Sequence, residues 1–281
     1  AISYHGWGVD VHHIKGIYSG EEGPFHLDMK VPVGPVPYRC LYSKNIKNMF
    51  IASRCGSFSH LGLGSVRVEN TIATMGQAVG TAAYLCKKYD VLPREIYMKY
   101  IEELQQILIC DDQTIIGVVN KDARDKAREA KISATSFNAE KCGYPENVVN
   151  GEIRSYEEKC NAWISDEKQG LPQSITLEFK KPEWISSVHI TSDTALTYPL
   201  FSPYPLNSSN DILSYDYTAC DMSVEVYTGN EWKMVARIKE NFCRKSKFCF
   251  EAEFAEKVRV TVIKTSGAQC AKLNEIRIYG E

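Results

Sequence analysis

The spacing of apolar residues changes once along the chain, and this change divides the sequence into a helical part and a β part. Between Ser65 and Leu108 apolar residues recur at three- and four-residue steps, as in helices with one buried face. Asn70–Lys88 has such a face, and Pro93 suits the first turn of a second helix. From Ile132 onward apolar and polar residues alternate in short runs between turn residues, which predicts an all-β sandwich.

The segment before the first long helix combines a short apolar run with several glycines. Asn48–Ala52 has the length of one buried strand, and Gly56, Gly62 and Gly64 follow in a loop. Gly76 and Gly80 in the helix predict the close approach of another backbone. A strand, a glycine loop and a helix N-terminus together can present backbone N–H groups to an anion or an electron-rich ring.

The length of 281 residues agrees with two modules, because single cores give way to two domains near this size. We predict an α+β fold in two modules, with a first domain at 1–118, a linker at 119–131 and a β-sandwich at 132–281. The linker is expected because the segment is highly charged, and its charges are interpreted as a solvated surface.

The formal charge of −2 gives no electrostatic reason to expect binding to nucleic acid, and no apolar run approaches the length of a membrane span. The ten cysteines contain no C-x-x-C pair, so we do not expect a metal cluster. Cys243 and Cys249 are interpreted either as free thiols on adjacent strands or as a disulfide across a hairpin. The cysteines therefore leave the compartment open.

Two stretches of the sequence resemble, in residue types and spacing, the C-terminal cofactor-contacting segment of FAD-dependent oxidoreductases: Pro37–Arg54 and Gly64–Ala83. The resemblance covers roughly residues 1–118 and implies a partial flavoprotein domain of strand, loop and long helices. No G-x-G-x-x-G occurs in the chain, and in that family the ADP-binding half comes first. We therefore expect this sequence to be the C-terminal portion of a longer protein whose missing N-terminal half is its partner in binding FAD.

This resemblance also implies a set of cofactor-binding residues. The positions that match are Arg54, His60, Gly64, Ser65 and Arg67. Arg67 is expected to stabilise the reduced ring or a substrate carboxylate. Ser53 departs from the family, which has a glycine there that lets the backbone approach the cofactor.

The N-terminal stretch Gly6-Trp-x-x-Asp-x-His12 resembles the substrate side of the same family. Asp10 and His12 are the predicted catalytic residues together with Arg67, because flavin chemistry needs a nearby proton donor or acceptor. In an extended strand both side chains point to one face. The alternatives are that His12 is packing and that Asp10 pairs with Arg39. Trp7 is expected in the core.

The β part, about residues 130–281, resembles a discoidin-like, galactose-binding-domain jelly roll in its landmarks Asn147–Glu152, Trp163 and Leu273–Tyr279. Such modules are often attached to glycan-processing enzymes. The resemblance implies a structural calcium ion, whose predicted ligands are Asn150, Glu152, Ser155 and Glu275. The alternative is that the two glutamates are solvated or salt-bridged. The aromatic-rich insert Ala195–Thr218 is expected either to dock against the first module or, as the less favoured alternative, to bind glycan.

These features predict the C-terminal region of a flavin-dependent oxidoreductase that acts on a small polar or carbohydrate-related substrate. The alternatives are a glycan-binding or polysaccharide-lyase-associated protein without flavin chemistry, and an inactive fragment. The expected location is the periplasm or outside the cell, and a cytoplasmic location is compatible with the sequence.

Overall fold

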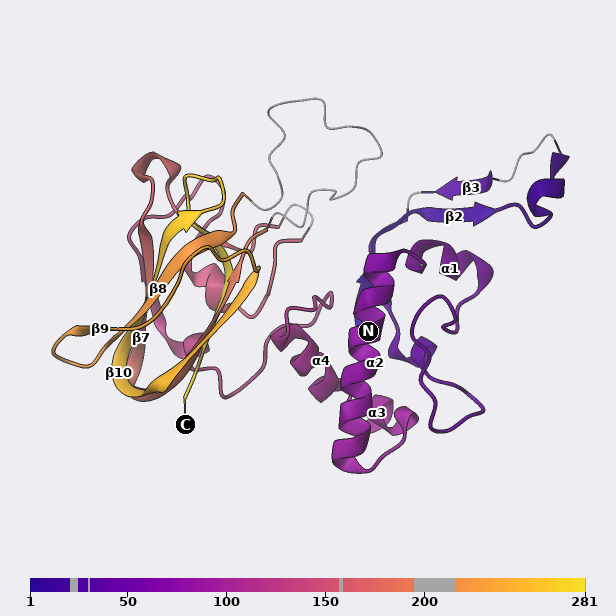
Figure 1. Cartoon of the computed structure of the whole chain (residues 1–281), viewed down its shortest axis with the longest axis horizontal. Helices are drawn as coiled ribbons and strands as arrows, with labels where there is room; N and C mark the ends of the chain where they lie inside the picture. The colour runs from indigo at the N-terminus through magenta and orange to yellow at the C-terminus, as the bar shows by residue number, and fades with distance from the viewer. Residues whose placement is uncertain (21–24, 30, 157–158, 195–215, 281) are drawn as a thin grey trace. The chain divides into compact units, whose positions relative to one another are not determined.

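The computed structural model describes residues 1–20, 25–29, 31–156, 159–194 and 216–280. The chain forms two compact units, Ala1–Val118 and Val119–Glu281 (Figure 1). The first is rich in helices and the second is an antiparallel β structure, which confirms the two-module α+β fold. No helix among the described residues is long and apolar enough to cross a membrane.

In its described residues, the first unit combines two small β pairs with four α-helices. Strand β1 (Ser3–His5) pairs with β4 (Gly34–Val36), and β2 (Val9–His12) pairs with β3 (Phe25–Met29). The helices are α1 (His60–Val66), α2 (Glu69–Tyr89), α3 (Pro93–Lys99) and α4 (Ile101–Cys110), and a short 3₁₀ turn, η3 (Tyr38–Leu41), follows β4.

Helix α2 forms where the spacing of small and apolar residues predicts it. Met75, Ala78, Ala82 and Leu85 are fully buried along one face, and Asp90 ends the helix in the left-handed conformation. The glycines of α2 do not meet the expectation of a close backbone within this chain. A Cβ added at Gly76 or Gly80 would have nothing within 4 Å, and both residues lie on the exposed face.

Two predicted elements of the first unit differ from the structure. The predicted strand Asn48–Ala52 contains only an isolated bridge between Tyr42 and Phe50, because this half-buried run has no neighbouring strand to pair with. The second long helix is divided into α3 and α4 at Tyr100, which leaves helical geometry at φ −130° and ψ 15°. The Tyr100 ring stacks on Tyr89 at 4.2 Å, which fixes the break against α2.

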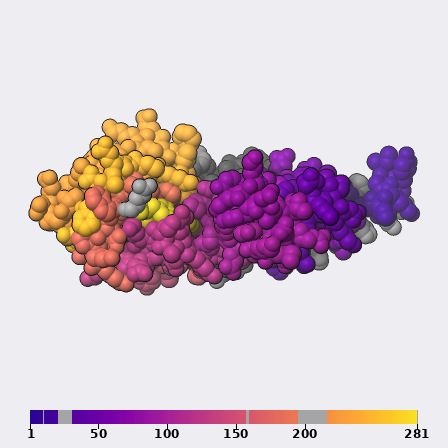
Figure 2. Space-filling view, turned by 90° about the horizontal axis from the view of Figure 1, so that it is seen from below, coloured from indigo at the N-terminus to yellow at the C-terminus, as the bar shows by residue number. Residues whose placement is uncertain are grey.

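The second unit is built on a seven-stranded antiparallel sheet in the order β6-β11-β7-β10-β8-β9, with β5 also paired to β7. Figure 2 shows the residues from β8 onward, coloured orange to yellow, gathered on this unit. The strands are β5 (Lys131–Ala134), β6 (Trp163–Ile164), β7 (Gln173–Ser192), β8 (Ala219–Tyr227), β9 (Trp232–Ile238), β10 (Lys245–Thr265) and β11 (Lys272–Tyr279).

The long strands β7 and β10 take part in both halves of the sandwich. The first part of β7 pairs with β5, its last part pairs with β11, and β10 follows it through both. Their register shifts between Cys249 and Glu253 and again between Ala255 and Lys257, where bulges let the strands bend. The enclosed core contains Trp163, Ile190, Val260 and Ile276, each at most 1% exposed.

The predicted linker 119–131 belongs to the second unit. Ala127, in the short 3₁₀ turn η4 (Lys126–Glu129), is fully buried in the core of the sandwich. The amide of Asn120 donates to the carbonyl oxygen of Gly151 at 2.8 Å, which ties the start of the segment to a later loop. The charged composition suggested a solvated connection, whereas its apolar and hydrogen-bonding residues are used in packing.

The cysteines are free thiols at all ten positions. Cys243 lies in the loop that precedes β10 and Cys249 lies within β10, so the two do not lie on adjacent strands of a hairpin. The interpretation as free thiols is correct, and their predicted placement on adjacent strands is wrong.

Candidate functional site

The predicted catalytic and cofactor residues lie on strand β2, on helix α1 and directly beside α1 in the first unit: Asp10 and His12 on β2, His60, Gly64 and Ser65 on α1, Arg54 in the loop before α1, and Arg67 directly after it. Helix α1 packs against β2 (Figure 1). Strand β2 carries Asp10 and His12 at alternate positions, with Asp10 opposite Asp28 of β3 in the backbone register. His12 is exposed, as a residue that exchanges protons with a substrate must be before the substrate binds. The fold therefore places the two sets of residues near each other.

Helix α1 is held at both ends by polar contacts. The hydroxyl of Ser59 accepts a hydrogen bond from the Gly62 amide and caps the helix. The Nε of Arg54 donates to the carbonyl oxygen of Arg67 at 3.2 Å, so the residues before and after α1 meet. His60 is exposed and Arg67 is half-buried.

Gly64 and Ser65 occupy a different environment from the other predicted cofactor residues. Both are buried within α1, with Ser65 only 5% exposed. They shape the helix that carries His60 and is followed by Arg67; Gly64 has no side chain, and the buried side chain of Ser65 has little surface to offer a ligand. Trp7 was expected in the core, but it is 45% exposed.

Ser53 has a backbone conformation that suits glycine. Its φ angle is 107°, a region in which a Cβ atom causes strain of about 1–3 kcal/mol. This is the position where the sequence resemblance implied a glycine. The backbone at this position thus has a conformation that suits glycine although the residue is serine.

The residues around α1 fit the ring end of a flavin in their chemistry. Two guanidinium groups and one imidazole, from Arg54, Arg67 and His60, are hydrogen-bond donors suited to an electron-rich ring that gains negative charge on reduction. The chain contains no G-x-G-x-x-G loop for the pyrophosphate.

The turn predicted to bind calcium is closed by hydrogen bonds within the chain. Asn150 Oδ1 accepts the Glu152 amide at 2.8 Å, and the Ser155 hydroxyl accepts the Asn161 amide at 3.0 Å. The carboxylate of Glu152 pairs with the ammonium group of Lys159. The oxygen atoms expected to face an ion are therefore already used.

Glu275, the fourth predicted calcium ligand, is buried between two cations. Its carboxylate lies 2.8 Å from Arg277 Nε and 3.6 Å from Lys245 Nζ, and the side chains of Glu275 and Arg277 are 3% and 1% exposed. A carboxylate already neutralised in this way is a poor ligand for a divalent cation.

A guanidinium group lies beside the predicted calcium turn. Arg244 donates to the carbonyl oxygen of Ser192 at 2.7 Å, to that of Ile153 at 2.7 Å and to Asn274 Oδ1 at 2.9 Å. Across the described part of the chain, no group of three or more His, Cys, Asp or Glu side chains could hold a metal ion. The residues present do not fit calcium, and the alternative of salt-bridged glutamates describes them better.

Comparisons with known proteins match the two units separately. Residues 1–108 match the family model described as FAD dependent oxidoreductase. No curated protein matches the chain. The solved structures that match include family 32 carbohydrate-binding modules.

One of these is a module of Clostridium perfringens in complex with GalNAc-β-1,3-galactose, with 16% identity and a TM-score of 0.42, covering 56% of this chain and 99% of that one. Another, from C. perfringens NanJ in complex with galactose, has 20% identity and a TM-score of 0.40, covering 55% and 97%. A third, from Streptococcus pneumoniae EndoD, has 17% identity and a TM-score of 0.42, covering 56% and 99%.

Proposed function

We propose that this chain is the C-terminal region of a flavin-dependent oxidoreductase with an attached discoidin-like module, and that it acts on a carbohydrate-related substrate. The observation that carries the proposal is the family match over residues 1–108. It is supported by the packing of α1, which carries three of the predicted cofactor residues, against β2, which carries Asp10 and His12. FAD, bound in the complete protein, would supply the acceptor for a hydride.

The side chains of β2 and α1 have distinct roles in this proposal. His12, with Asp10 on the same strand, exchanges the proton that accompanies hydride transfer. Arg67 provides positive charge for the reduced ring or a substrate carboxylate, and the hydrogen bond from Arg54 to its carbonyl oxygen positions it. His60 adds a donor from the exposed side of α1.

The proposed complete protein also contains an N-terminal half that carries the pyrophosphate loop, because FAD binding needs this loop. The exposed face of α2 offers a surface for this half. Ala73, Gly76, Gly80 and Ala83 lie along this face, and small residues allow a second helix to approach closely. A periplasmic or secreted location remains part of the proposal.

A second candidate function is glycan binding by the β-module without flavin chemistry. The observation that favours it is a pair of exposed aromatic rings, Phe137 and Tyr144, with centroids 5.8 Å apart and exposures of 47% and 45%. Exposed rings can stack on the apolar face of a sugar. Most of the insert Ala195–Thr218, the other predicted glycan surface, lies outside the described residues.

The absorbance spectrum of the complete protein distinguishes the two functions. A flavoprotein absorbs at about 450 nm, and this absorbance falls when its substrate reduces the flavin in the absence of oxygen. The isolated chain should bind FAD only weakly. Submicromolar FAD affinity of the isolated chain would contradict the fragment interpretation, and a colourless complete protein that binds galactose would favour the second function.

A further inference from the structure

A concave site on the first unit is separate from the residues assigned to the flavin, and its described lining contains three cations and one acid. Its volume is about 410 Å³. The lining residues come from the loop after η3 and from the start of α3: Tyr42, Ser43, Lys44, Asn45, Lys47, Leu92, Arg94 and Glu95. The predicted cofactor and catalytic residues do not line it.

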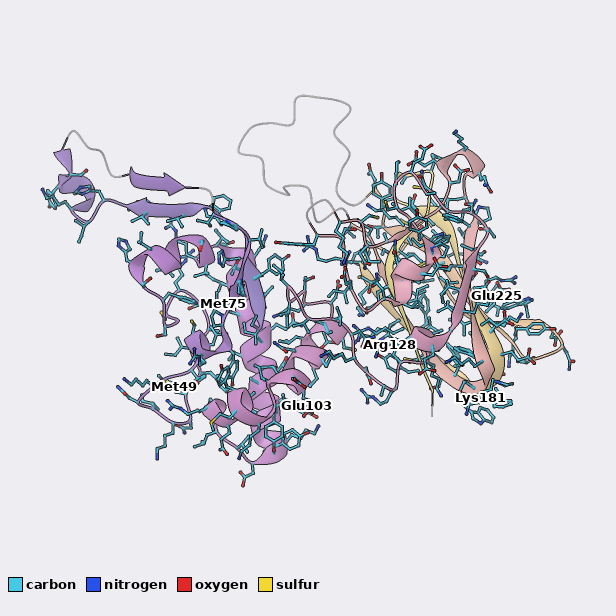
Figure 3. The ribbon with its side chains drawn as sticks, turned by 180° about the vertical axis from the view of Figure 1, so that it is seen from behind. Met49, Met75, Glu103, Arg128, Lys181 and Glu225 are labelled. Carbon is cyan, nitrogen blue, oxygen red and sulfur yellow. The ribbon has the colours of Figure 1, made fainter. Side chains whose placement is uncertain are left out.

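The loop that forms one wall of the site has a defined backbone. The Ser43 hydroxyl accepts hydrogen bonds from the amides of Asn45 at 3.2 Å and Ile46 at 3.0 Å. The Ser43 amide donates to the carbonyl oxygen of Met49, labelled in Figure 3, and closes the loop. Lys44 and Lys47 are carried on this closed loop, whose hydrogen bonds fix the backbone from which their exposed side chains extend.

The opposite wall, at the start of α3, is fixed to two tyrosines, Tyr38 of η3 and Tyr42 directly after it. The buried hydroxyl of Tyr38 donates to the carbonyl oxygen of Pro93 at 2.8 Å, which anchors the start of α3. The ring of Tyr38 lies 5.4 Å from that of Tyr42, and the Arg94 guanidinium lies 5.9 Å from the centroid of Tyr42. Tyr42 therefore links the two walls.

The charge of the site is positive. The one acid among its described lining residues, Glu95, accepts hydrogen bonds from Lys99 at 2.9 Å and from the Leu92 amide at 3.1 Å, and these hold the pKa of the carboxyl below its usual range. Among the described residues, no carboxylate forms an ion pair with the three lining cations, Lys44, Lys47 and Arg94.

We propose that this site binds a phosphate group, either free or carried by a small sugar. Two ammonium groups and a guanidinium fork can share the oxygen atoms of one phosphate, and the Asn45 side chain adds a neutral donor. The volume exceeds the needs of a single phosphate and leaves room for an organic part against Tyr42. This inference does not depend on flavin chemistry, since it uses none of those residues.

The test is calorimetric titration of the full chain at low ionic strength with two probes, inorganic phosphate and glucose 6-phosphate. The variants are Lys44→Gln, Lys47→Gln and Arg94→Gln, and the control is Lys87→Gln, which removes an exposed cation of α2 outside the site. Melting temperatures establish that each variant is folded.

We expect each site variant to weaken binding roughly 3- to 10-fold, added salt to weaken it further, and the control to leave it unchanged. Tighter binding of glucose 6-phosphate supports a sugar phosphate, and equal binding of both probes supports phosphate alone. The proposal is overturned if neither probe binds at millimolar concentration, or if Lys87→Gln weakens binding as much as the site variants.

Discussion

The guanidinium of Arg244 donates a hydrogen bond to the backbone carbonyl oxygen of Ile153 at 2.7 Å. The same side chain donates to Asn274 Oδ1, so it links the turn near residue 150 to the last strand, β11. These are the two segments that the sequence resemblance expected a calcium ion to join. The fork of donors on an arginine can satisfy several oxygen atoms without a metal.

The first prediction is that this linkage stabilises the β-module without calcium. Arg244→Met leaves three oxygen acceptors without their donor and should lower the unfolding free energy by about 2–4 kcal/mol. The exposed Arg237→Met serves as the control and should change it by less than about 0.5 kcal/mol. Urea unfolding measures both.

Calcium itself provides the second half of that test. The melting temperature of the wild-type chain should be the same with added calcium and with a chelator, because an ion raises it only by binding the folded state. A melting temperature that falls on chelation would mean that Asn150, Glu152, Ser155 or Glu275 does hold a metal.

The second prediction concerns a buried acid in the segment first interpreted as a linker. Burial raises the pKa of Asp125 to about 6. Hydrogen bonds from the Ile278 and Ala127 amides and the charge of Arg277 lower this pKa, but burial has the larger effect. The unfolded carboxyl titrates near 3.8. The folded state therefore binds more protons between about pH 4 and 6, so the unfolding free energy should fall as pH rises through this window.

The size of this fall is bounded by the shift of about two pKa units, which corresponds to about 3 kcal/mol. Asp125→Asn keeps an acceptor for the two amides and removes the titration, so its unfolding free energy should depend less on pH. Asp166→Asn, a half-buried acid elsewhere in the unit, is the control. Urea unfolding at a series of pH values that gives the same slope for Asp125→Asn and the wild type would contradict the prediction.

The alternation of apolar and polar residues predicted the β strands well, because in a strand with one buried face every second side chain is buried. The alternating run of 174–179 lies in β7, and that of 257–262 lies in β10. The pattern could not show that both strands continue through bulges into the other half of the sandwich, since bends depend on packing between distant residues. It also missed the burial of Asp125, because the amides that satisfy this carboxylate include one from β11.

The roles of the candidate site residues stay predictions, and the structure shows only where these residues lie. The strand expected for Asp10 and His12 is present as β2. The packing of that strand on α1 depends on tertiary contacts that no local pattern records. The apolar run Asn48–Ala52 shows the opposite case, because it had the composition of a strand but no partner in the fold.

The third prediction follows from the backbone of Ser53. Replacing Ser53 by glycine removes a Cβ atom from a residue with φ 107° and should raise the unfolding free energy by about 1 kcal/mol. Ser57 lacks a positive φ angle, so Ser57→Gly should lower stability through the added freedom of the unfolded chain. Equal effects of the two substitutions would show that the Ser53 backbone is not strained.

The last prediction tests the proton chemistry of β2 in the complete protein. Because a positioned histidine typically contributes about 10²- to 10⁴-fold to rate, His12→Ala should slow substrate-driven flavin reduction by a comparable factor while the bound flavin remains. Arg67→Ala should weaken substrate and flavin together, because its charge acts on both. His13→Ala is the neighbouring control and should have a small effect. Stopped-flow absorbance measures the reduction, and an undiminished rate in a stable His12→Ala protein would assign the proton transfer to another residue.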